Sequence, residues 1–327
     1  AGYELFTWNN GVHNNVVTVK DDVTYFTGNH KITAGLTYEY QMVDNSYMRN
    51  GTGYYRYASL DDFLNQRAPE TVCLTYGYDG EKNPAARVRY HQFGAYGQDE
   101  WTPTDNFKLT YGVRLDMIAF DNQDLMTNNA ILAVDYNGKN IDTGRWPTTK
   151  VRVSPRVGFT WDVLGNKSLK VRGGTGFFTG RLPLVFFTNM PTNSGMVQNL
   201  TSISTDKGGV APKELAQFAG PMITDVDKLI QKLHSINPEK YPLTITPDKG
   251  VLPDAIQAVD PKFKMPTVWK TSIAVDYQLP VGFPLTVTGE FMYNKTINAV
   301  MLQDWNMADP DGFSRLTGID NRHIFPE

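Results

Sequence analysis

Apolar and polar residues alternate along several segments of the chain. In the clearest segment, Phe107 to Leu115, odd-numbered positions are apolar and even-numbered positions are polar, charged or glycine. A period of two places apolar side chains on one face of a β-strand and polar side chains on the other. The pattern recurs at Ile32–Tyr40, Val157–Val163, Ile273–Leu279 and Leu285–Tyr293. It predicts an all-β protein whose sheet has one apolar face and one wet face.

The predicted strands group into hairpins. We expect about eight antiparallel strands, in pairs at about residues 14–41, 88–118, 152–179 and 267–301. The connection within each pair is short and rich in turn residues, as at Gly28-Asn29-His30. The connections between pairs are long and polar, at about residues 42–87, 119–151 and 180–266. Such alternation is typical of a transmembrane β-barrel, with periplasmic turns and long extracellular loops.

Local structure is also expected inside the long loops. Ser59–Gln66 and Thr224–His234 have apolar residues at helical spacing, and Ser59 is a suitable N-cap, so both segments predict short surface helices. The segment Leu182–Phe187 is the most apolar stretch outside the strands. It is expected either to extend the sixth strand beyond the membrane or to dock a partner protein.

Composition excludes several classes of protein. The 327 residues are 41% apolar and 12% aromatic, which fits soluble β proteins and porin-like barrels equally. No apolar run approaches the roughly 20 residues of a spanning helix. A net charge of −3 provides no basic field for nucleic acid. The single cysteine, Cys73, excludes a disulfide framework and is expected to be structural or incidental.

The two faces of the predicted sheet can be assigned from the free-energy cost of placing a charged side chain in lipid. A lysine or arginine on the lipid side costs roughly 2–4 kcal/mol at the bilayer midplane, so the charged face is expected to line a wet interior. Aromatic residues near strand ends suit the interfacial girdles, namely Trp101, Trp161, Tyr277 and Tyr293. Ordinary sheet core is the alternative interpretation. The expected lumen-facing residues are Lys108, Arg114, Asp116, Arg156, Asp162, Lys170, Arg172, Lys270, Asp276 and Glu290.

Two consecutive hairpins resemble a known family. The first contains Phe93-Gly-Ala-Tyr-Gly-Gln-Asp-Glu-Trp101 and Phe107-Lys-Leu-Thr-Tyr-Gly-Val-Arg-Leu-Asp116. The second contains Ser154-Pro-Arg-Val-Gly-Phe-Thr-Trp161 and Leu169-Lys-Val-Arg-Gly-Gly-Thr-Gly-Phe-Phe178. Both resemble barrel hairpins of TonB-dependent outer-membrane receptors. The sequence of Arg172–Arg181 and of the Phe313–Pro326 loop is similar to the Oar-like branch, which carries a carboxypeptidase-regulatory-like N-terminal domain.

The resemblance implies energy-coupled import through a barrel of about 22 strands. Its implied partners are outer-membrane lipid, the remaining barrel strands, an N-terminal plug domain and an inner-membrane TonB-type energy transducer. No segment of this chain resembles the plug or its coupling peptide. With short turns on the periplasmic side, both termini fall on the extracellular side, so the chain is expected to be a fragment. The implied location is the bacterial outer membrane.

Catalytic and metal-binding patterns are weak. Asp116, Asp162, Asp276 and Glu290 lie on separate predicted strands and are expected to be solvated charges rather than paired catalytic carboxylates. The five histidines show no ligand spacing. Gly173, Gly174, Gly176 and Gly180 fail the dinucleotide and P-loop patterns, and are expected to pack closely against another element, such as a plug. We therefore expect a non-enzymatic protein without cofactors.

Ligand contacts are expected from the long loops, because loops above a rigid barrel carry recognition. The candidates for stacking on a sugar or gripping a peptide are Tyr54, Tyr55, Tyr57, Trp146, Phe186 and Phe187. Packing of the loops on each other is the alternative for each of them. Three hypotheses therefore stand: a TonB-dependent receptor importing a glycan, peptide or metal chelate; a structural or adhesive outer-membrane protein that displays loops or docks partner proteins; and a soluble β-sandwich binding module.

Overall fold

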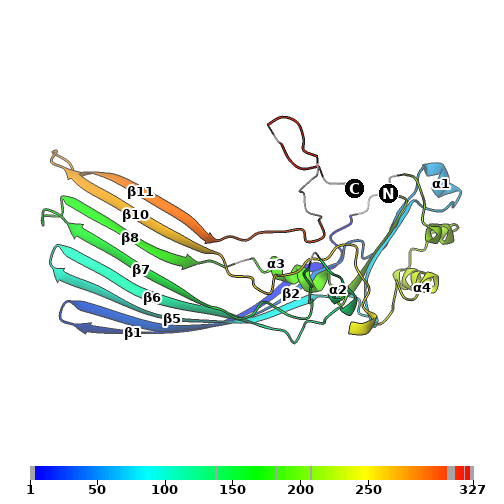
Figure 1. Cartoon of the computed structure of the whole chain (residues 1–327), viewed down its shortest axis with the longest axis horizontal. Helices are drawn as coiled ribbons and strands as arrows, with labels where there is room; N and C mark the ends of the chain where they lie inside the picture. Colours follow the sequence, from blue (N-terminus) through cyan, green and yellow to red (C-terminus); the bar gives the residue numbers. More distant parts are fainter. Residues whose placement is uncertain are drawn as a thin grey trace.

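A computed structural model shows one large curved sheet that leads into a region of folded loops (Figure 1). The structure describes residues 4–136, 138–181, 183–206, 208–307, 314–319 and 321–324. The large sheet has eight strands in the order β1-β2-β5-β6-β7-β8-β10-β11, and each strand is antiparallel to its neighbours. Within the described residues the sheet is open between β1 and β11. It is a partial barrel.

The strands of the large sheet include the predicted hairpins. A short turn joins the two strands of each hairpin, as at Gly28, whose positive φ of 53° suits glycine. The first three strands of the sheet are 18 or 19 residues long, whereas about 9–11 residues span a bilayer. These strands are therefore longer than a bilayer would require, and they continue into the loop region. The bounds are Asn10–Thr27 (β1), His30–Tyr47 (β2), Ala86–Thr104 (β5), Phe107–Asp121 (β6), Val151–Asp162 (β7), Leu169–Thr179 (β8), Thr267–Leu279 (β10) and Leu285–Asn298 (β11).

The loops contain a second sheet that alternation did not predict. Strands β3 (Tyr54–Arg56), β4 (Thr71–Gly77) and β9 (Gln198–Ser204) pair in the order β3-β4-β9. All seven residues of β4 are buried, so both of its faces are covered. A strand covered on both faces needs no alternation of apolar and polar residues, and this explains why the period-two pattern missed it.

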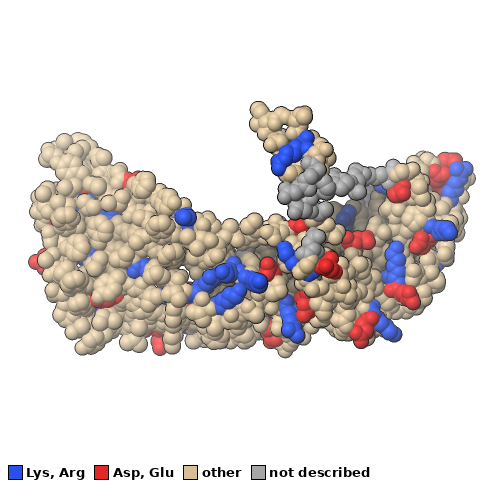
Figure 2. All heavy atoms as spheres, in the orientation of Figure 1, with Lys and Arg blue, Asp and Glu red and all other residues tan. Residues whose placement is uncertain are grey.

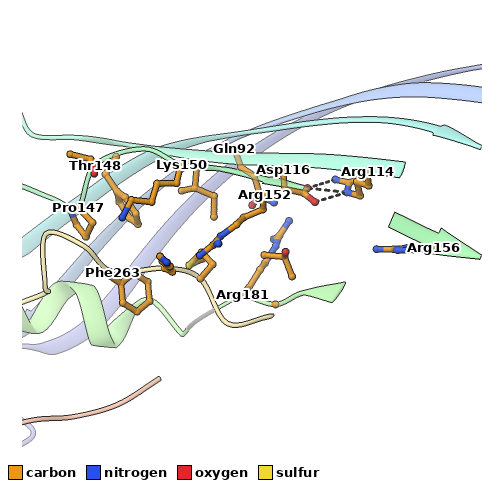
Figure 3. Close-up of a pocket in the computed structure, with 16 residues that line it drawn as sticks. Gln92, Arg114, Asp116, Pro147, Thr148, Lys150, Arg152, Arg156, Arg181 and Phe263 are labelled. Atoms are coloured by element: carbon orange, nitrogen blue, oxygen red, sulfur yellow. Dashed lines mark hydrogen bonds and ion pairs between the residues drawn. The ribbon is translucent and has the colours of Figure 1, made fainter. Parts of the chain in front are cut away.

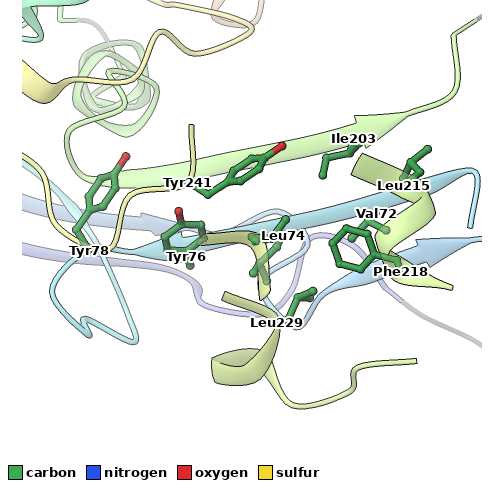
Figure 4. Packing of buried hydrophobic residues seen from close by; sticks show 10 residues of the cluster. Val72, Leu74, Tyr76, Tyr78, Ile203, Leu215, Phe218, Leu229 and Tyr241 are labelled. Carbon is green, nitrogen blue, oxygen red and sulfur yellow. The ribbon is translucent and has the colours of Figure 1, made fainter. Parts of the chain in front are cut away.

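A hydrophobic core holds the second sheet to helix α4 (Val226–Ile236) (Figure 4). Leu229 and Leu233 of the helix are 1% and 0% exposed and pack with residues of β4 and β9. The helix begins after Asp225, whose side chain accepts a hydrogen bond from the Lys228 amide. The predicted helix in Thr224–His234 is therefore confirmed. The buried members of the cluster are Val72, Leu74, Tyr76, Tyr78, Ile203, Leu215, Phe218, Leu229, Leu233 and Tyr241.

The other helices are short. Helix α1 (Leu60–Leu64) confirms the prediction for Ser59–Gln66, and Ser59 caps it by accepting from the Asp62 amide at 3.0 Å. The loop region also contains helix α2 (Asn129–Leu132), helix α3 (Val185–Thr192) and two 3₁₀ turns, Lys213–Phe218 and Pro247–Lys249. Among the described residues, no helix is long and apolar enough to cross a membrane.

Helix α3 (Val185–Thr192) corrects the prediction of an extended sixth strand. Strand β8, the sixth strand of the large sheet, ends at Thr179, and the apolar stretch after it folds back as a helix against β2 and β5. Five residues of α3 are buried, including Phe187. The apolar residues of this segment therefore serve to pack α3 against β2 and β5. Leu182 lies outside the described residues.

Alkaline pH is expected to loosen this loop core. Tyr55 packs against the cluster and donates to the Ile223 carbonyl at 3.1 Å, and burial raises the pKa of its phenol to about 12. The folded state favours the neutral phenol, so this contribution is complete below pH 10 and is lost as the pH rises towards 12. We expect the near-ultraviolet circular dichroism signal to fall over this range. In Tyr55→Phe the fall should shift to higher pH. Identical pH profiles would contradict this assignment.

Candidate ligand-binding site

The register of the large sheet gathers the predicted charged residues on one face. Within β6–β11, even-numbered residues pair with even-numbered residues, from Lys108↔Thr160 across to Ala274↔Glu290. All ten residues predicted to face a lumen therefore share this face, which we call the polar face. They are Lys108, Arg114, Asp116, Arg156, Asp162, Lys170, Arg172, Lys270, Asp276 and Glu290.

The opposite face is apolar and exposed. Leu36, Val113 and Ile273 are 66%, 44% and 48% exposed although each lies within a paired strand. An apolar band of this extent on a soluble protein would need a partner to cover it. The candidate girdle residues Trp101, Trp161, Tyr277 and Tyr293 all lie on this face. Near the turns, Trp101 stacks on His30 with ring centroids 5.7 Å apart.

Charges near the turn end of the polar face are largely paired. Lys31 lies 2.9 Å from Glu100, and Lys108 lies 3.6 Å from the same carboxylate. Further along the same face, on β8, β10 and β11, Arg172 lies 3.1 Å from Asp276 and 3.9 Å from Glu290. Acidic and basic groups balance here, so this part of the wall presents little net field.

Glycines make room for polar contacts that cross strands. Arg114 reaches over Gly94 of β5 to donate to the Thr37 hydroxyl at 3.2 Å. A Cβ on Gly94 would lie 2.4 Å from an Arg114 guanidinium nitrogen, so a larger residue would block this contact. Arg114 also holds Asp116 at 2.8 Å. The wall is thus a network of fixed polar groups.

A cationic pocket lies where the strands meet the loops. It has a volume of about 240 Å³. Residues of β5, β6, β7 and β8 form it together with Gly180, Arg181 and two loop segments, residues 147–150 and 263–265. Figure 3 shows side chains from the wall and from the loops converging on the same space. Figure 2 shows a group of basic side chains in the middle of the molecule. The charged lining residues are Arg114, Lys150, Arg152, Arg156, Arg181, Lys264 and a single carboxylate, Asp116.

Several polar atoms of the pocket have no partner within the described part of the chain. These are one guanidinium nitrogen of Arg152, the Thr179 hydroxyl and the Gln92 side-chain oxygen, and all three are buried. Buried polar groups are nearly always hydrogen-bonded, and an unpaired one is costly. The pocket is therefore prepared for a polar group that the described residues do not supply.

Of the charged residues that line the pocket, Arg114, Asp116 and Arg156 were predicted from the sequence to share the polar face, and the others were not. A signal for Arg152 was present, because Lys150, Arg152, Ser154 and Arg156 occupy alternate positions at the start of β7. Lys264 and Arg181 lie in loops, where no periodicity exists to place them. Their convergence with β7 depends on the tertiary fold.

The loop aromatics predicted as ligand contacts separate into two groups. Trp146 and Phe187 are 5% and 1% exposed and form a core with Val88 and Met190, with Phe120 packed against them. Tyr55 is half-buried against the other loop core, and Tyr57 packs edge-on against Phe63 at 5.3 Å. Phe186 is 43% exposed, and Tyr54 lies in β3. The six residues therefore do not form one cluster. Trp146 and Phe187, the two most buried, lie with ring centroids 6.0 Å apart in a core that supports the loops.

No group of three or more His, Cys, Asp or Glu side chains in the described part of the chain is placed to hold a metal ion. Cys73 is buried in β4, lies 3.4 Å from the Ser202 hydroxyl and has a thiol pKa raised by burial. Among the glycines of β8, Gly174 and Gly176 lie on the polar face, whereas Gly173 lies on the apolar face.

Comparison with solved structures shows similarity to outer-membrane transporters. The outer membrane transporter YddB from Escherichia coli is 15% identical with a TM-score of 0.46, over 87% of this chain and 26% of that chain. The FrpB iron transporter from Neisseria meningitidis is 12% identical with a TM-score of 0.43, over 89% and 29%. The copper transporter OprC is 11% identical with a TM-score of 0.40, over 86% and 30%. The chain thus spans less than a third of each of these proteins.

A family model settles the class of the protein. No curated protein sequence matches the chain. A model described as an outer membrane beta barrel domain matches residues 5–327, which is nearly the whole chain. This match confirms the predicted fold class and location, and the soluble β-sandwich hypothesis is wrong. It does not address the Oar-like branch, which stays a prediction. The chain belongs to the outer membrane β-barrel domain family and is a protein of the bacterial outer membrane.

Proposed function

We propose that this chain forms part of the wall of a TonB-dependent receptor that imports a solute by energy coupling. The observation that carries the proposal is the sorting of the sheet into an apolar face and a polar face with a cationic pocket at its loop end. The polar face would line the lumen, and the apolar face would contact lipid. Import also requires a plug, further strands and an energy transducer, all of which belong to the proposal.

The architecture of the loops supports a receptor. The loop region has two hydrophobic cores of its own and a second sheet, so it forms a shaped surface above the strands. The pocket opens between this surface and the wall. A solute held by the loops would therefore meet the cationic part of the wall next. Tyr54, Tyr57 and Phe186 remain the proposed contacts for such a solute on the loops.

The same loop region supports an alternative function. A folded surface with its own core can dock a partner protein or adhere to a substratum without any import. The exposed apolar residues Leu60, Phe63 and Leu64 of α1 favour this alternative, at 72%, 44% and 67% exposure. The two functions differ in whether solutes cross the outer membrane.

Comparison of spent media tests import whatever the solute is. The source bacterium, a strain lacking the gene and a strain lacking the TonB-type transducer are grown in the same complex medium. Mass spectrometry then identifies the solutes that each strain leaves behind. We expect the gene deletion to leave one or a few solutes that the parent consumes. The transducer mutant should leave the same solutes among others, because import through this receptor needs energy.

Two results would contradict the proposal. Consumption of every solute by the deletion strain, together with loss of surface attachment or of a co-purifying protein, would favour the adhesive alternative. Uptake that depends on the gene but persists without the transducer would indicate passive diffusion. Complementation with the intact gene is the control for both.

A further inference from the structure

We propose that the cationic pocket binds the oxyanion group of the imported solute, which is a carboxylate, phosphate or sulfate. This inference names the chemical class of the solute and rests on the proposed import function only for its passage onward. Binding itself is a property of the pocket. The solutes therefore carry negative charge.

The first support is the imbalance of charge. Six cationic side chains and one carboxylate line the pocket. The carboxylate, Asp116, already lies 2.8 Å from Arg114, and Arg181 lies 3.0 Å from Glu39. Four cations remain, Lys150, Arg152, Arg156 and Lys264, and none of them forms an ion pair within the described residues. Like charges held together in a partly covered space repel unless an anion joins them.

The second support is the geometry of the unpaired atoms. A buried guanidinium nitrogen of Arg152 and the Thr179 hydroxyl can both donate to an acceptor, and neither has a partner within the described chain. Figure 3 shows Arg152 reaching from the wall towards the loop segment that carries Phe263. Guanidinium groups present planar, fixed donors that match the oxygens of carboxylate and phosphate. The buried oxygen of Gln92 can accept from a hydroxyl of the same solute.

The third support is the arrangement around Arg156. Opposite Arg156, the neighbouring strand carries Gly176, and the next strand carries Lys270. The Arg156 guanidinium lies 4.3 Å from the centre of the Phe178 ring, and the Lys270 ammonium lies 5.6 Å from it. The Phe178 ring forms cation–π interactions with both side chains, and these interactions do not neutralise their positive charges. The positive field therefore extends from the pocket down the polar face.

Size and place limit the ligand. A volume of about 240 Å³ admits an oxyanion with several carbon atoms, so a large solute would insert only its charged end. The pocket lies at the loop ends of β7 and β8, on the side that a solute from outside reaches first. This position favours an external solute over a buried segment of the same protein.

Calorimetric titration of the purified protein tests the inference. The probes are citrate and inorganic phosphate at low ionic strength, with glucose as the neutral probe. We expect an oxyanion to bind, glucose not to bind, and added salt to weaken the binding. Arg152→Gln should weaken it by at least about tenfold, since a hydrogen bond to a charged group is lost. The control Arg145→Gln removes a cation that is 80% exposed outside the pocket, and should change affinity less than about twofold.

In the titration, any of three results would overturn the inference: the absence of binding by either anion, equal binding of glucose, or equal effects of the two substitutions. A cross-linking experiment provides a separate test. A carbodiimide cross-link from Lys150 to a carboxylate elsewhere in the protein, with no anion bound, would show that the protein fills its own pocket. Heat-modifiable migration of both variants verifies that the barrel is folded. The titration uses no energy source, so its failure is distinct from a failure of import.

Discussion

Replacing Val113 with arginine is expected to destabilise the barrel, lowering its free energy of unfolding by about 2–4 kcal/mol. Val113 lies near the centre of the apolar band of β6, is 44% exposed and pairs with Gly97 and Pro155. On this face the arginine would lie in hydrocarbon, where its charge loses hydration and finds no partner. The measurement is a urea titration of the barrel in lipid vesicles, followed by its heat-modifiable band on a gel.

Thr110→Arg is the matched control. Thr110 lies on the polar face of the same strand, directly opposite Glu100 on β5. An arginine there would remain in water beside a carboxylate and should cost less than about 1 kcal/mol. If the two variants lose similar stability, the apolar face does not contact lipid. A larger loss for Thr110→Arg would reverse the assignment of the faces.

The second large effect is expected from Phe187. Its side chain is 1% exposed and contacts the rings of Phe120, Trp146 and Phe263 at centroid distances of 4.8, 6.0 and 5.9 Å. Phe187→Ala would leave a cavity at the junction of α3 and the sheet, at a cost of about 3–5 kcal/mol. We propose that this core lies outside the membrane on the cell surface, so the loss should appear as faster protease cleavage of the loops on intact cells. The heat-modifiable barrel should persist.

The neighbouring residue provides the control for this prediction. Phe186 is 43% exposed, so Phe186→Ala should change loop stability by less than about 1 kcal/mol. Both residues were candidate ligand contacts from the sequence. Equal protease sensitivity of the two variants would show that α3 does not pack as the structure describes. Weaker solute capture by Phe186→Ala alone would support its proposed role in recognition.

The large sheet could be predicted because its two faces meet different environments. Segments such as Phe107–Leu115 must alternate to satisfy lipid on one side and water on the other. Turn residues such as Gly28 then mark the ends of the hairpins. The loop region could not be predicted in the same way. Strand β4 is buried on both faces, and α3 mixes apolar residues with Thr188 and Thr192, which are also buried, so neither shows a simple period.

The candidate site was predicted only in part, for a related reason. Arg114 and Arg156 follow from the alternation of β6 and β7, and the same rule places Arg152 on the polar face at the start of β7. Lys264 comes from a loop more than a hundred residues away in sequence. Its place in the same pocket as Arg152 is set by long-range packing of the loops, which no local pattern encodes.

The most direct test of the account is to measure which face of the sheet contacts lipid. In a Cys73→Ser background, single cysteines at Ile273 and Ser272 are labelled with a fluorophore in the membrane-embedded protein. These adjacent residues of β10 lie on opposite faces of the sheet. If the apolar face contacts lipid, brominated lipid will quench the label at position 273 and leave the label at position 272 accessible to an aqueous quencher. Quenching by lipid at position 272, or equally at both positions, would contradict the account.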